Sequence, residues 1–383
     1  MSPQNPSRGA SVMIIAGETS GDQHGARLVA AMRKIDDNIA FFGIGGPSME
    51  KEGVEIVVDA ASLSVVGITE AFSRMPGILG GLSAIKRAVA KKRPGLVILI
   101  DFPDFNLHMA RYVKRFSIPV LYYISPQVWA WRSGRIKKIR KYVDRMAVIL
   151  PFEKSFYEQH GIPVTFVGHP LLDHRFGDPH DLQSVSDGEK RVIGLLPGSR
   201  HQEIARNLPV MLAAATHVNR KLSGITYIVS VAPGIDTEKV LEYIRPYREV
   251  MDIDISKGQI ENVLEQCTMA IAASGTVTLE TAIYGVPMVI VYHVSPVSYM
   301  LGRALIRVEH IGLANIIAKE RIVPELLQKD ATPANIAQAV IHLMENPELR
   351  EETRKKLRMV RDQLGGAGAS GKTAGIAYSM IQK

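Results

Sequence analysis

Short runs of β-branched and other apolar residues alternate with longer helical patterns along nearly the whole chain, and this alternation restricts the fold more than any other feature. It is typical of parallel sheets whose strands are joined by right-handed helical crossovers. The apolar runs are continuous, as expected for strands that helices cover on both faces. The predicted strands lie near residues 12–16, 96–100, 120–124, 145–150 and 164–167, and then near 192–196, 227–231, 252–255, 269–272 and 288–292.

The chain length and the break between the two strand series predict two domains. A chain of 383 residues suits two α/β domains of ordinary size. Polar residues with a proline and glycines fill 173–189, which indicates an interdomain connection. We therefore predict an α/β protein in which two doubly wound, Rossmann-like domains, 1–170 and 171–346, face each other across a cleft and are followed by C-terminal helices in 347–383.

The composition excludes several classes of protein. With 46% hydrophobic and 22% charged residues, the chain is neither disordered nor fibrous. The single cysteine, Cys267, cannot close an intramolecular disulfide or build a multi-cysteine zinc site, which favours a reducing compartment such as the cytoplasm. No stretch reaches the ~18 apolar residues of a spanning helix, so we expect any membrane contact to be peripheral. The net charge of +8 favours an anionic partner only weakly.

The loop after the first predicted strand, residues 16–25, concentrates polar side chains. Its glycines are spaced by four, which does not match the G-x-G-x-x-G pattern, so NAD binding is disfavoured. Glu18, Ser20 and Asp22 follow the strand, where the carboxyl edge of a parallel sheet binds ligands. Turn chemistry explains the glycines but not these three polar residues together.

Asp101 directly follows the predicted strand at 96–100 and is expected at the same edge of the sheet. A carboxylate held against apolar strand ends has its pKa raised toward neutrality, which suits a general base. Asp104 has two interpretations, as a ligand contact or as a cap of the helix that follows Pro103.

Two loops of the second domain have the composition of anion-binding turns. The turn Gly198-Ser199-Arg200 precedes a helix, so backbone N–H groups, the helix dipole and a guanidinium converge where a diphosphate would bind. The turn Ser274-Gly275-Thr276 repeats the pattern, and Glu280 follows one helical turn later, where a carboxylate accepts ribose hydroxyls. The alternatives are a Pro-Gly turn with a surface arginine and an ordinary glutamate in the first turn of a helix.

Two further segments have more than one interpretation. Trp129 and Trp131 precede a basic helical run that extends to Arg145, which indicates a solvated basic face, an anionic membrane surface or a nucleic-acid contact. Residues 65–82 are apolar and contain helix breakers, which suits core packing or a surface for acyl chains.

Three motifs are predicted to be decoys. Residues 366–373 match the phosphate-loop pattern G-x-x-x-x-G-K-[ST], but they follow a charged helix rather than a buried strand. Asp252 and Asp254 imitate a D-x-D metal motif without a further ligand nearby in the sequence, and we interpret their segment as an edge strand. His169 ends the last strand of the first domain, as a linker residue or a ligand contact.

Taken in order, these motifs resemble the lipid-A-disaccharide synthase family, glycosyltransferases with a B-type (GT-B) fold of two Rossmann-like domains. No single motif carries the resemblance, and together they cover residues 16–318. The matching stretches are AGETSGD, IDFPDFN, SPQVWAWR, ILPFEKSFY, FVGHP, LLPGSR, SGTVTLE and LANIIA.

The resemblance implies an inverting transfer of 2,3-diacylglucosamine from its UDP derivative to 2,3-diacylglucosamine 1-phosphate, which yields a β-1,6-linked disaccharide 1-phosphate and UDP. It implies no cofactor and no metal ion. It assigns the acceptor to the first domain and UDP to the second, with the C-terminal helices packing back on the first domain. It also implies a cytoplasmic enzyme associated peripherally with the inner membrane, and it leaves open a homodimer that exchanges its C-terminal helices.

The resemblance further implies roles for individual residues. Asp101 matches the family's essential aspartate and is expected to be the base, with Glu18 as the alternative and Ser20 beside it. The donor is expected at Gly198, Ser199, Arg200, Ser274, Gly275, Thr276, Glu280 and Asn315. The acceptor and its acyl chains are expected at Asp104, Gln127, Trp129, Trp131, Val66, Ile68, Phe72 and Met75. Ala314 departs from the family pattern, which has a proline before the asparagine.

Rival functions make different predictions. A UDP-N-acetylglucosamine-type epimerase, or another UDP-sugar glycosyltransferase of the same fold, would use the same donor pocket, and the epimerase would need no lipid site. A nucleic-acid-binding protein would use the basic run 132–141, although we expect no nucleic-acid partner. A P-loop NTPase would require Lys372.

Overall fold

The computed structural model describes residues 10–63, 75–130, 134–173, 191–293 and 309–382. The chain divides into two compact units, Met1–His174 with Leu364–Lys383, and Arg175–Gln363. The expected linker 173–189 lies almost entirely outside the described residues. Both units are parallel α/β structures, which confirms the predicted fold class.

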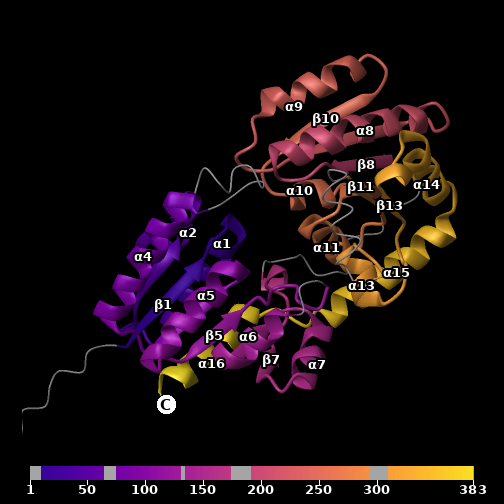
Figure 1. Ribbon diagram of the computed structural model, residues 1–383. Coiled ribbons are helices and arrows are strands. Elements are labelled where there is room, and N and C mark those ends of the chain that lie inside the picture. The colour runs from indigo at the N-terminus through magenta and orange to yellow at the C-terminus, as the bar shows by residue number, and fades with distance from the viewer. Residues whose placement is uncertain (1–9, 64–74, 131–133, 174–190, 294–308, 383) are drawn as a thin grey trace, which may run out of the picture. The chain divides into compact units, whose positions relative to one another are not determined.

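The described part of the first unit is built on a seven-stranded sheet with the order β3-β2-β1-β4-β5-β6-β7. Figure 1 labels three of these strands, β1, β5 and β7. Every neighbouring pair of strands is parallel. The strands are β1 (Ser11–Ala16), β2 (Ala40–Gly45), β3 (Glu55–Asp59), β4 (Leu96–Ile100), β5 (Val120–Tyr123), β6 (Arg145–Val148) and β7 (Val164–Phe166). The helices are α1 (Thr19–Arg33), α2 (Pro47–Lys51), α4 (Met75–Lys92), α5 (Pro103–Val113), α6 (Arg135–Tyr142), α7 (Pro151–Gln159) and α16 (Ala369–Ile381), with 3₁₀ turns η1 (Ala60–Ser62), η2 (Lys114–Phe116) and η3 (Pro170–Asp173).

Helices cover both faces of this sheet. Successive side chains of a strand point to opposite faces, and because these strands are apolar at successive positions, both faces must be buried. In β1, Met13 and Ile15 belong to the core beneath α4, α5, α6 and α7. Val12 and Ile14 belong to the core on the other face, which α1, α2 and α16 cover. All four side chains are completely buried, as predicted for a strand with a continuous apolar sequence.

The described part of the second unit has a six-stranded parallel sheet with the order β10-β9-β8-β11-β12-β13. The strands are β8 (Arg191–Leu196), β9 (Ile225–Val231), β10 (Asp252–Lys257), β11 (Met269–Ala273), β12 (Met288–Tyr292) and β13 (Glu325–Leu327). The helices are α8 (His201–Asn219), α9 (Thr237–Ile244), α10 (Glu261–Leu264), α11 (Thr276–Ile283), α13 (Leu313–Ala318), α14 (Pro333–Glu345) and α15 (Pro347–Gln363), with 3₁₀ turns η4 (Arg245–Tyr247) and η5 (Gln328–Asp330).

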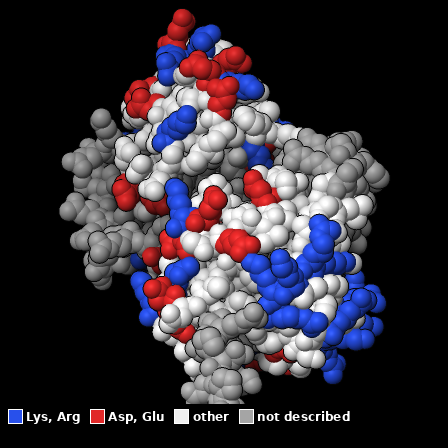
Figure 2. All heavy atoms as spheres, turned by 90° about the vertical axis from the view of Figure 1, so that its left-hand side faces the viewer, with Lys and Arg blue, Asp and Glu red and all other residues white. Residues whose placement is uncertain are grey.

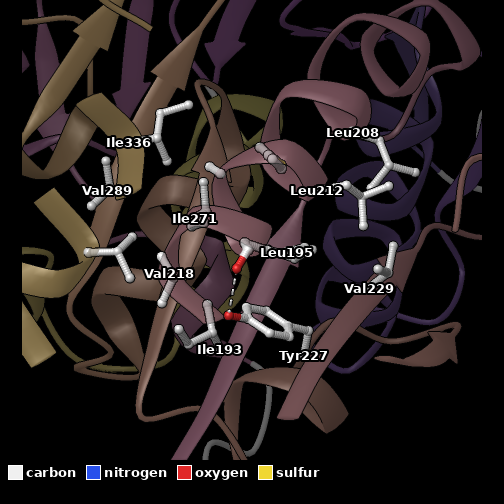
Figure 3. Packing of buried hydrophobic residues seen from close by; sticks show 14 of the residues in the cluster. Ile193, Leu195, Leu208, Leu212, Val218, Tyr227, Val229, Ile271, Val289 and Ile336 are labelled. Carbon is white, nitrogen blue, oxygen red and sulfur yellow. Dashed lines mark hydrogen bonds between the residues drawn. The ribbon is translucent and has the colours of Figure 1, made fainter. Parts of the chain in front are cut away.

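The core of the second unit lies between its sheet and the helices α8, α9 and α14. Leu208 and Leu212 of α8 pack over strand residues of β8 and β9, and Ile336 of α14 covers the side of β12 (Figure 3). The Tyr227 hydroxyl is buried in this core and donates a hydrogen bond of 3.1 Å to the Ala215 carbonyl, so its polar atom is satisfied.

The C-terminal helices belong to different units. The sequence-based division placed all of 347–383 with the first domain. In the structure α15 packs against α11, α13 and α14 of the second unit, whereas α16 packs against α1 of the first. The reason is the break at 364–368, where glycines at positive φ end one helix before the next begins.

Candidate active site

The strand order of the first sheet reverses between β1 and β4. Ala16 of β1 pairs with Ile100 of β4, so the loop that begins at Gly17 and the segment that begins at Asp101 leave the sheet side by side. Such a switch point is where open parallel sheets bind ligands. The structure therefore brings together two of the segments that the sequence singled out.

The backbone around Asp101 is strained and held in place. Asp101 has φ 45° and Phe102 φ 46°, the left-handed region that costs ordinary residues about 1–3 kcal/mol each. The Asp101 carbonyl accepts hydrogen bonds from the Tyr122 hydroxyl at 2.5 Å and from Asn106 Nδ2 at 2.7 Å. Gly17 lies against this turn, because a Cβ there would overlap the Phe102 ring. These contacts hold the backbone of Asp101 in place at the sheet edge.

The carboxyl group of Asp101 has the electrostatics of a general base. Burial, with a smaller contribution from the negative charge of Glu18, raises its pKa from 3.8 to about 6, and a hydrogen bond from the Phe102 backbone opposes the rise. The sequence-based prediction of a raised pKa is thus confirmed. At pH 7 the group is mostly ionised and still basic enough to accept a proton.

The polar residues of the first loop separate into two groups. Glu18 precedes α1 and Ser20 lies in its first turn, and both are exposed. Asp22 is buried and accepts backbone hydrogen bonds from Gly46, Ser48 and Met49 at 2.7–3.1 Å. Asp22 therefore anchors the start of α2, whereas Glu18 and Ser20 are accessible to a ligand.

A buried carboxyl that the sequence analysis did not single out holds the loop after β5. Glu153 Oε1 accepts from Ser125 Oγ at 2.8 Å and from Trp129 Nε1 at 3.2 Å, while Oε2 accepts from the Leu150 N–H at 3.0 Å. Burial raises the pKa of Glu153 to about 7, although these hydrogen bonds oppose the shift. Glu153 thereby orients a loop that follows the strand next to β4.

The residues expected to bind the acceptor differ in exposure and in their contacts, and some of them lie outside the described residues. Gln127 is exposed and Trp129 is half-buried, with its ring edge-on to Phe152 at 4.8 Å. Asp104 forms an ion pair of 2.6 Å with Arg135. Met75 begins α4. The remaining expected residues, Val66, Ile68, Phe72 and Trp131, lie outside the described residues.

The second sheet has a switch point of its own, between β8 and β11. Leu196 pairs with Ala272, so the turns at 197–200 and 274–276 leave this sheet side by side. Each turn leads directly into a helix, α8 or α11. Their glycines have φ values that only glycine adopts readily, 117° at Gly198 and 152° at Gly275. Both predicted anion-binding turns therefore lie at one edge of one sheet.

A glutamate of α8 occupies part of the first of these turns. Glu203 Oε2 accepts the Ser199 N–H at 3.0 Å, and Oε1 accepts from Arg200 Nη1 at 3.1 Å. A Cβ on Gly198 would lie 2.5 Å from the same carboxylate. An anion already binds this N–H group and guanidinium, which is the chemistry that the sequence predicted for a phosphate.

The second turn presents a more buried carboxyl group. Glu280 lies in α11, one turn beyond Thr276, and burial, aided by the charge of Glu261, raises its pKa to about 7. Gly275 and Thr276 are exposed, whereas Ser274 is half-buried. The carboxyl group and the start of the helix therefore belong to the same loop-helix element, as predicted.

Asn315 has a different environment from the other expected donor residues. It is completely buried. Its Nδ2 donates to the Val323 carbonyl and, at 2.7 Å, to Glu325 Oε1, and its Oδ1 accepts the Val323 N–H. Glu325 in turn accepts the N–H groups of Ile311 and Gly312. Asn315 thus holds the turn that begins α13.

The structure explains why the phosphate-loop pattern at 366–373 is a decoy. The Asp173 carboxylate accepts the backbone N–H groups of Gly368, Ala369 and Ser370 at 2.7–3.0 Å and the Ser370 hydroxyl at 2.7 Å. Although burial opposes it, these bonds lower the pKa of Asp173. The start of α16 is therefore capped by an internal carboxylate.

The other two motifs, the pair Asp252 and Asp254 and the single His169, also have structural explanations. Asp252 and Asp254 are exposed on the edge strand β10, as predicted. No group of three or more His, Cys, Asp or Glu side chains within the described ranges could hold a metal ion. His169 is buried, and burial lowers its pKa to about 3, so it is neutral.

Two parallel α/β units, each with its polar loops at a switch point, are the architecture of the class of two-domain proteins with the GT-B fold. Solved structures agree with this class. CalG4, the calicheamicin glycosyltransferase, superposes with a TM-score of 0.61 at 16% identity over 98% of this chain and 99% of that chain. A UDP co-structure of MnaA from S. aureus gives 0.64 at 12% identity over 98% of each.

Sequence comparison narrows the class to one family. The family model described as Lipid-A-disaccharide synthetase matches residues 12–377. A Lipid-A-disaccharide synthase from Geobacter metallireducens is 45% identical over 376 residues, which is 97% of both chains. The chain therefore belongs to the lipid-A-disaccharide synthase family, as its motifs predicted.

Proposed function

We propose that the protein transfers 2,3-diacylglucosamine from its UDP derivative to the 6-hydroxyl of 2,3-diacylglucosamine 1-phosphate, with inversion at the anomeric carbon. Membership of the lipid-A-disaccharide synthase family supports the reaction class. The observation that carries the mechanism is Asp101, a half-buried carboxyl with a pKa of about 6 at the switch point of the first sheet.

Asp101 accepts the proton of the attacking hydroxyl as the new bond to the anomeric carbon forms and the bond to UDP breaks. The strained turn and the hydrogen bonds that Tyr122 and Asn106 donate to the Asp101 carbonyl fix the backbone that carries the carboxylate. Glu18, beside it, raises the basicity of Asp101 and contacts the acceptor together with Ser20.

The second unit binds UDP. Arg200 and the N–H groups of the turns at 198–200 and 274–276 stabilise the diphosphate as negative charge develops on it, so no metal ion or other cofactor takes part. Glu280 accepts the ribose hydroxyls. The diphosphate competes with Glu203 for Arg200 and the Ser199 N–H, since both are anions with the same hydrogen-bond donors.

We also infer that the first unit contacts the cytoplasmic face of the inner membrane. Figure 2 shows Lys and Arg side chains gathered on one part of the surface. Around His108, cationic side chains for this contact come from α4 and from the turn after α5 (Lys86 and Arg115). None of the described helices is both long enough and apolar enough to cross a bilayer. A basic surface of this kind attracts anionic lipids.

The test is product analysis with defined substrates. The purified protein, incubated with both diacylated sugars, is expected to form a tetra-acylated disaccharide phosphate and UDP in equal amounts, measured by mass spectrometry, with the same rate in EDTA. Release of an epimerised sugar nucleotide without disaccharide would establish the epimerase alternative. Loss of activity in EDTA that added Mg²⁺ restores would contradict the metal-free mechanism.

A further inference from the structure

A cavity of about 630 Å³ lies between α5 and α6 in the first unit. Leu107 and Tyr142 contribute its apolar surface. The remaining lining residues are Asp104, His108, Arg111, Gly134, Arg135 and Lys138. The cavity thus combines an apolar surface with side chains that bind an anion.

The charges that line this cavity are predominantly positive. Asp104 is paired with Arg135, so the net charge of the lining comes from Arg111 and Lys138, for which no carboxylate lies within ion-pair distance in the described part of the chain. Burial and then the surrounding cations lower the pKa of His108, whose Nε2 lies 3.0 Å from Lys86 Nζ. A neutral His108 that accepts from Lys86 has its other ring N–H available to donate.

The cavity begins close to the proposed base. Asp104 is in the first turn of α5, three residues after Asp101, and Arg111 lies further along the same helix. Seven residues of helix correspond to about 10 Å along the axis. We therefore take the Asp104 end of the cavity as the end that faces Asp101, so that a ligand with its hydroxyl at Asp101 has its anionic group between the two helices.

We propose that this cavity is the binding site for the phosphomonoester of the acceptor, with Arg111, Lys138 and His108 as its ligands. The inference rests on the proposed function, which supplies an acceptor with a hydroxyl at one end of a hexose and a phosphate at the other. A dianionic phosphate is the group that a guanidinium, an ammonium and an imidazole N–H recognise together. Asp104 holds Arg135 at the entrance, beside the sugar.

The experiment compares phosphorylated and dephosphorylated acceptors. For Lys138→Ala and Arg111→Ala, kcat/KM for the phosphorylated acceptor is expected to fall roughly 10- to 100-fold, because charge-assisted hydrogen bonds are lost. With the dephosphorylated acceptor both variants are expected to stay within about threefold of the wild type, and KM for the donor is unchanged. The matched control is Lys137→Ala, which removes the same charge from an exposed neighbouring position that does not line the cavity; its preference for the phosphorylated acceptor is expected to equal that of the wild type.

A second readout separates this site from the reaction itself. Glucosamine 1-phosphate, followed by NMR of the His108 ring, is expected to raise the pKa of His108 in the wild type but not in Lys138→Ala, since a bound anion favours the imidazolium. If the wild type forms no disaccharide but His108 responds in this way, the proposed reaction fails and the anion site stands. If disaccharide forms and the variants keep the wild-type preference for phosphate, the site is refuted.

The lipid surface is the other source of phosphate. The vesicle test measures sedimentation with phosphatidylglycerol vesicles. The site belongs to the acceptor if Lys138→Ala and Arg111→Ala weaken sedimentation no more than Lys137→Ala does, and if these two variants lose the preference for the phosphorylated acceptor while Lys137→Ala keeps it. If they weaken vesicle binding more than the control and leave that preference intact, these side chains serve lipid headgroups and the proposal is overturned.

Discussion

The two switch points of the molecule have the same topology and opposite chemistry. At the first, between β1 and β4, a half-buried carboxyl with a raised pKa lies on a left-handed turn. At the second, between β8 and β11, glycine turns present N–H groups and an arginine at the starts of helices. Under the proposed function, the same sheet topology locates both sites, and the few residues after each strand decide whether a site accepts a proton or binds an anion.

The largest effect is expected from removing the base. Asp101→Asn keeps the size and hydrogen-bonding geometry of the side chain but cannot accept the proton, so kcat is expected to fall by roughly 10²–10⁴. UDP affinity measured by calorimetry is expected to stay within about twofold, because the donor turns belong to the other unit. Turnover near the wild-type value would remove Asp101 from this role.

The same substitution is expected to stabilise the fold. Folding raises the pKa of Asp101, so its contribution to stability is fully present below its unfolded pKa of 3.8 and is lost as the pH rises through about 6. Each tenfold change in proton affinity corresponds to about 1.4 kcal/mol, so Asp101→Asn is expected to raise the free energy of unfolding by up to roughly 3 kcal/mol at pH 8. Urea unfolding at pH 8 and at pH 4 measures this, and an equal effect at both values would contradict the assignment.

At the second switch point, loss of the guanidinium is expected to weaken anion binding. Arg200→Ala removes charge-assisted hydrogen bonds to the diphosphate, so calorimetric affinity for UDP is expected to fall roughly 10-fold. Affinity for uridine, which has no phosphate, is the control and is expected to stay the same. An unchanged affinity for UDP would exclude Arg200 from the donor site.

The internal anion at this turn has the opposite expected effect. Glu203→Gln removes the charge that competes for Arg200 and the Ser199 N–H, so UDP is expected to bind roughly threefold more tightly. Glu238→Gln, on the exposed first turn of α9, is the matched control. Weaker binding of UDP in Glu203→Gln would show that the carboxylate positions Arg200 instead of competing with the diphosphate.

The smallest effect is expected at the neighbour of the base. Glu18→Gln removes a negative charge that raises the pKa of Asp101, so the acid limb of the pH profile of kcat/KM is expected to move to lower pH by about half a unit. Because Glu18 is also expected to contact the acceptor, the readout is the midpoint of the acid limb in each variant's own profile and not the absolute value of kcat/KM. A limb that stays in place would show that Glu18 does not act on Asp101.

Most of the fold could be predicted because the central strands are continuous apolar runs. The strand at 96–100 has the same bounds in the structure as in the prediction. Strand β2 was missed because glycines interrupt its sequence; at Gly43 a side chain would overlap the Ile14 carbonyl of β1. Strand β13 was missed because Glu325-Leu326-Leu327 is not a run of β-branched residues and begins with a charged side chain.

The site could be predicted less completely, because several polar residues act through partners far away in the sequence. Asp22, in the same motif as Glu18, caps α2, which begins more than twenty residues later. Glu153 bonds to Ser125 and Trp129 across a strand and a helix. The sequence locates such residues near a site, but only the packed structure separates those that position the backbone from those that remain accessible to a ligand.

The pH dependence of kcat/KM for the wild-type protein tests the central claim most directly. Because Asp101 must be ionised to accept the proton, activity is expected to fall with decreasing pH through a single limb with a midpoint at about 6. A rate that stays constant from pH 8 down to pH 5, in a protein that remains folded, would show that no carboxyl with a raised pKa serves as the base.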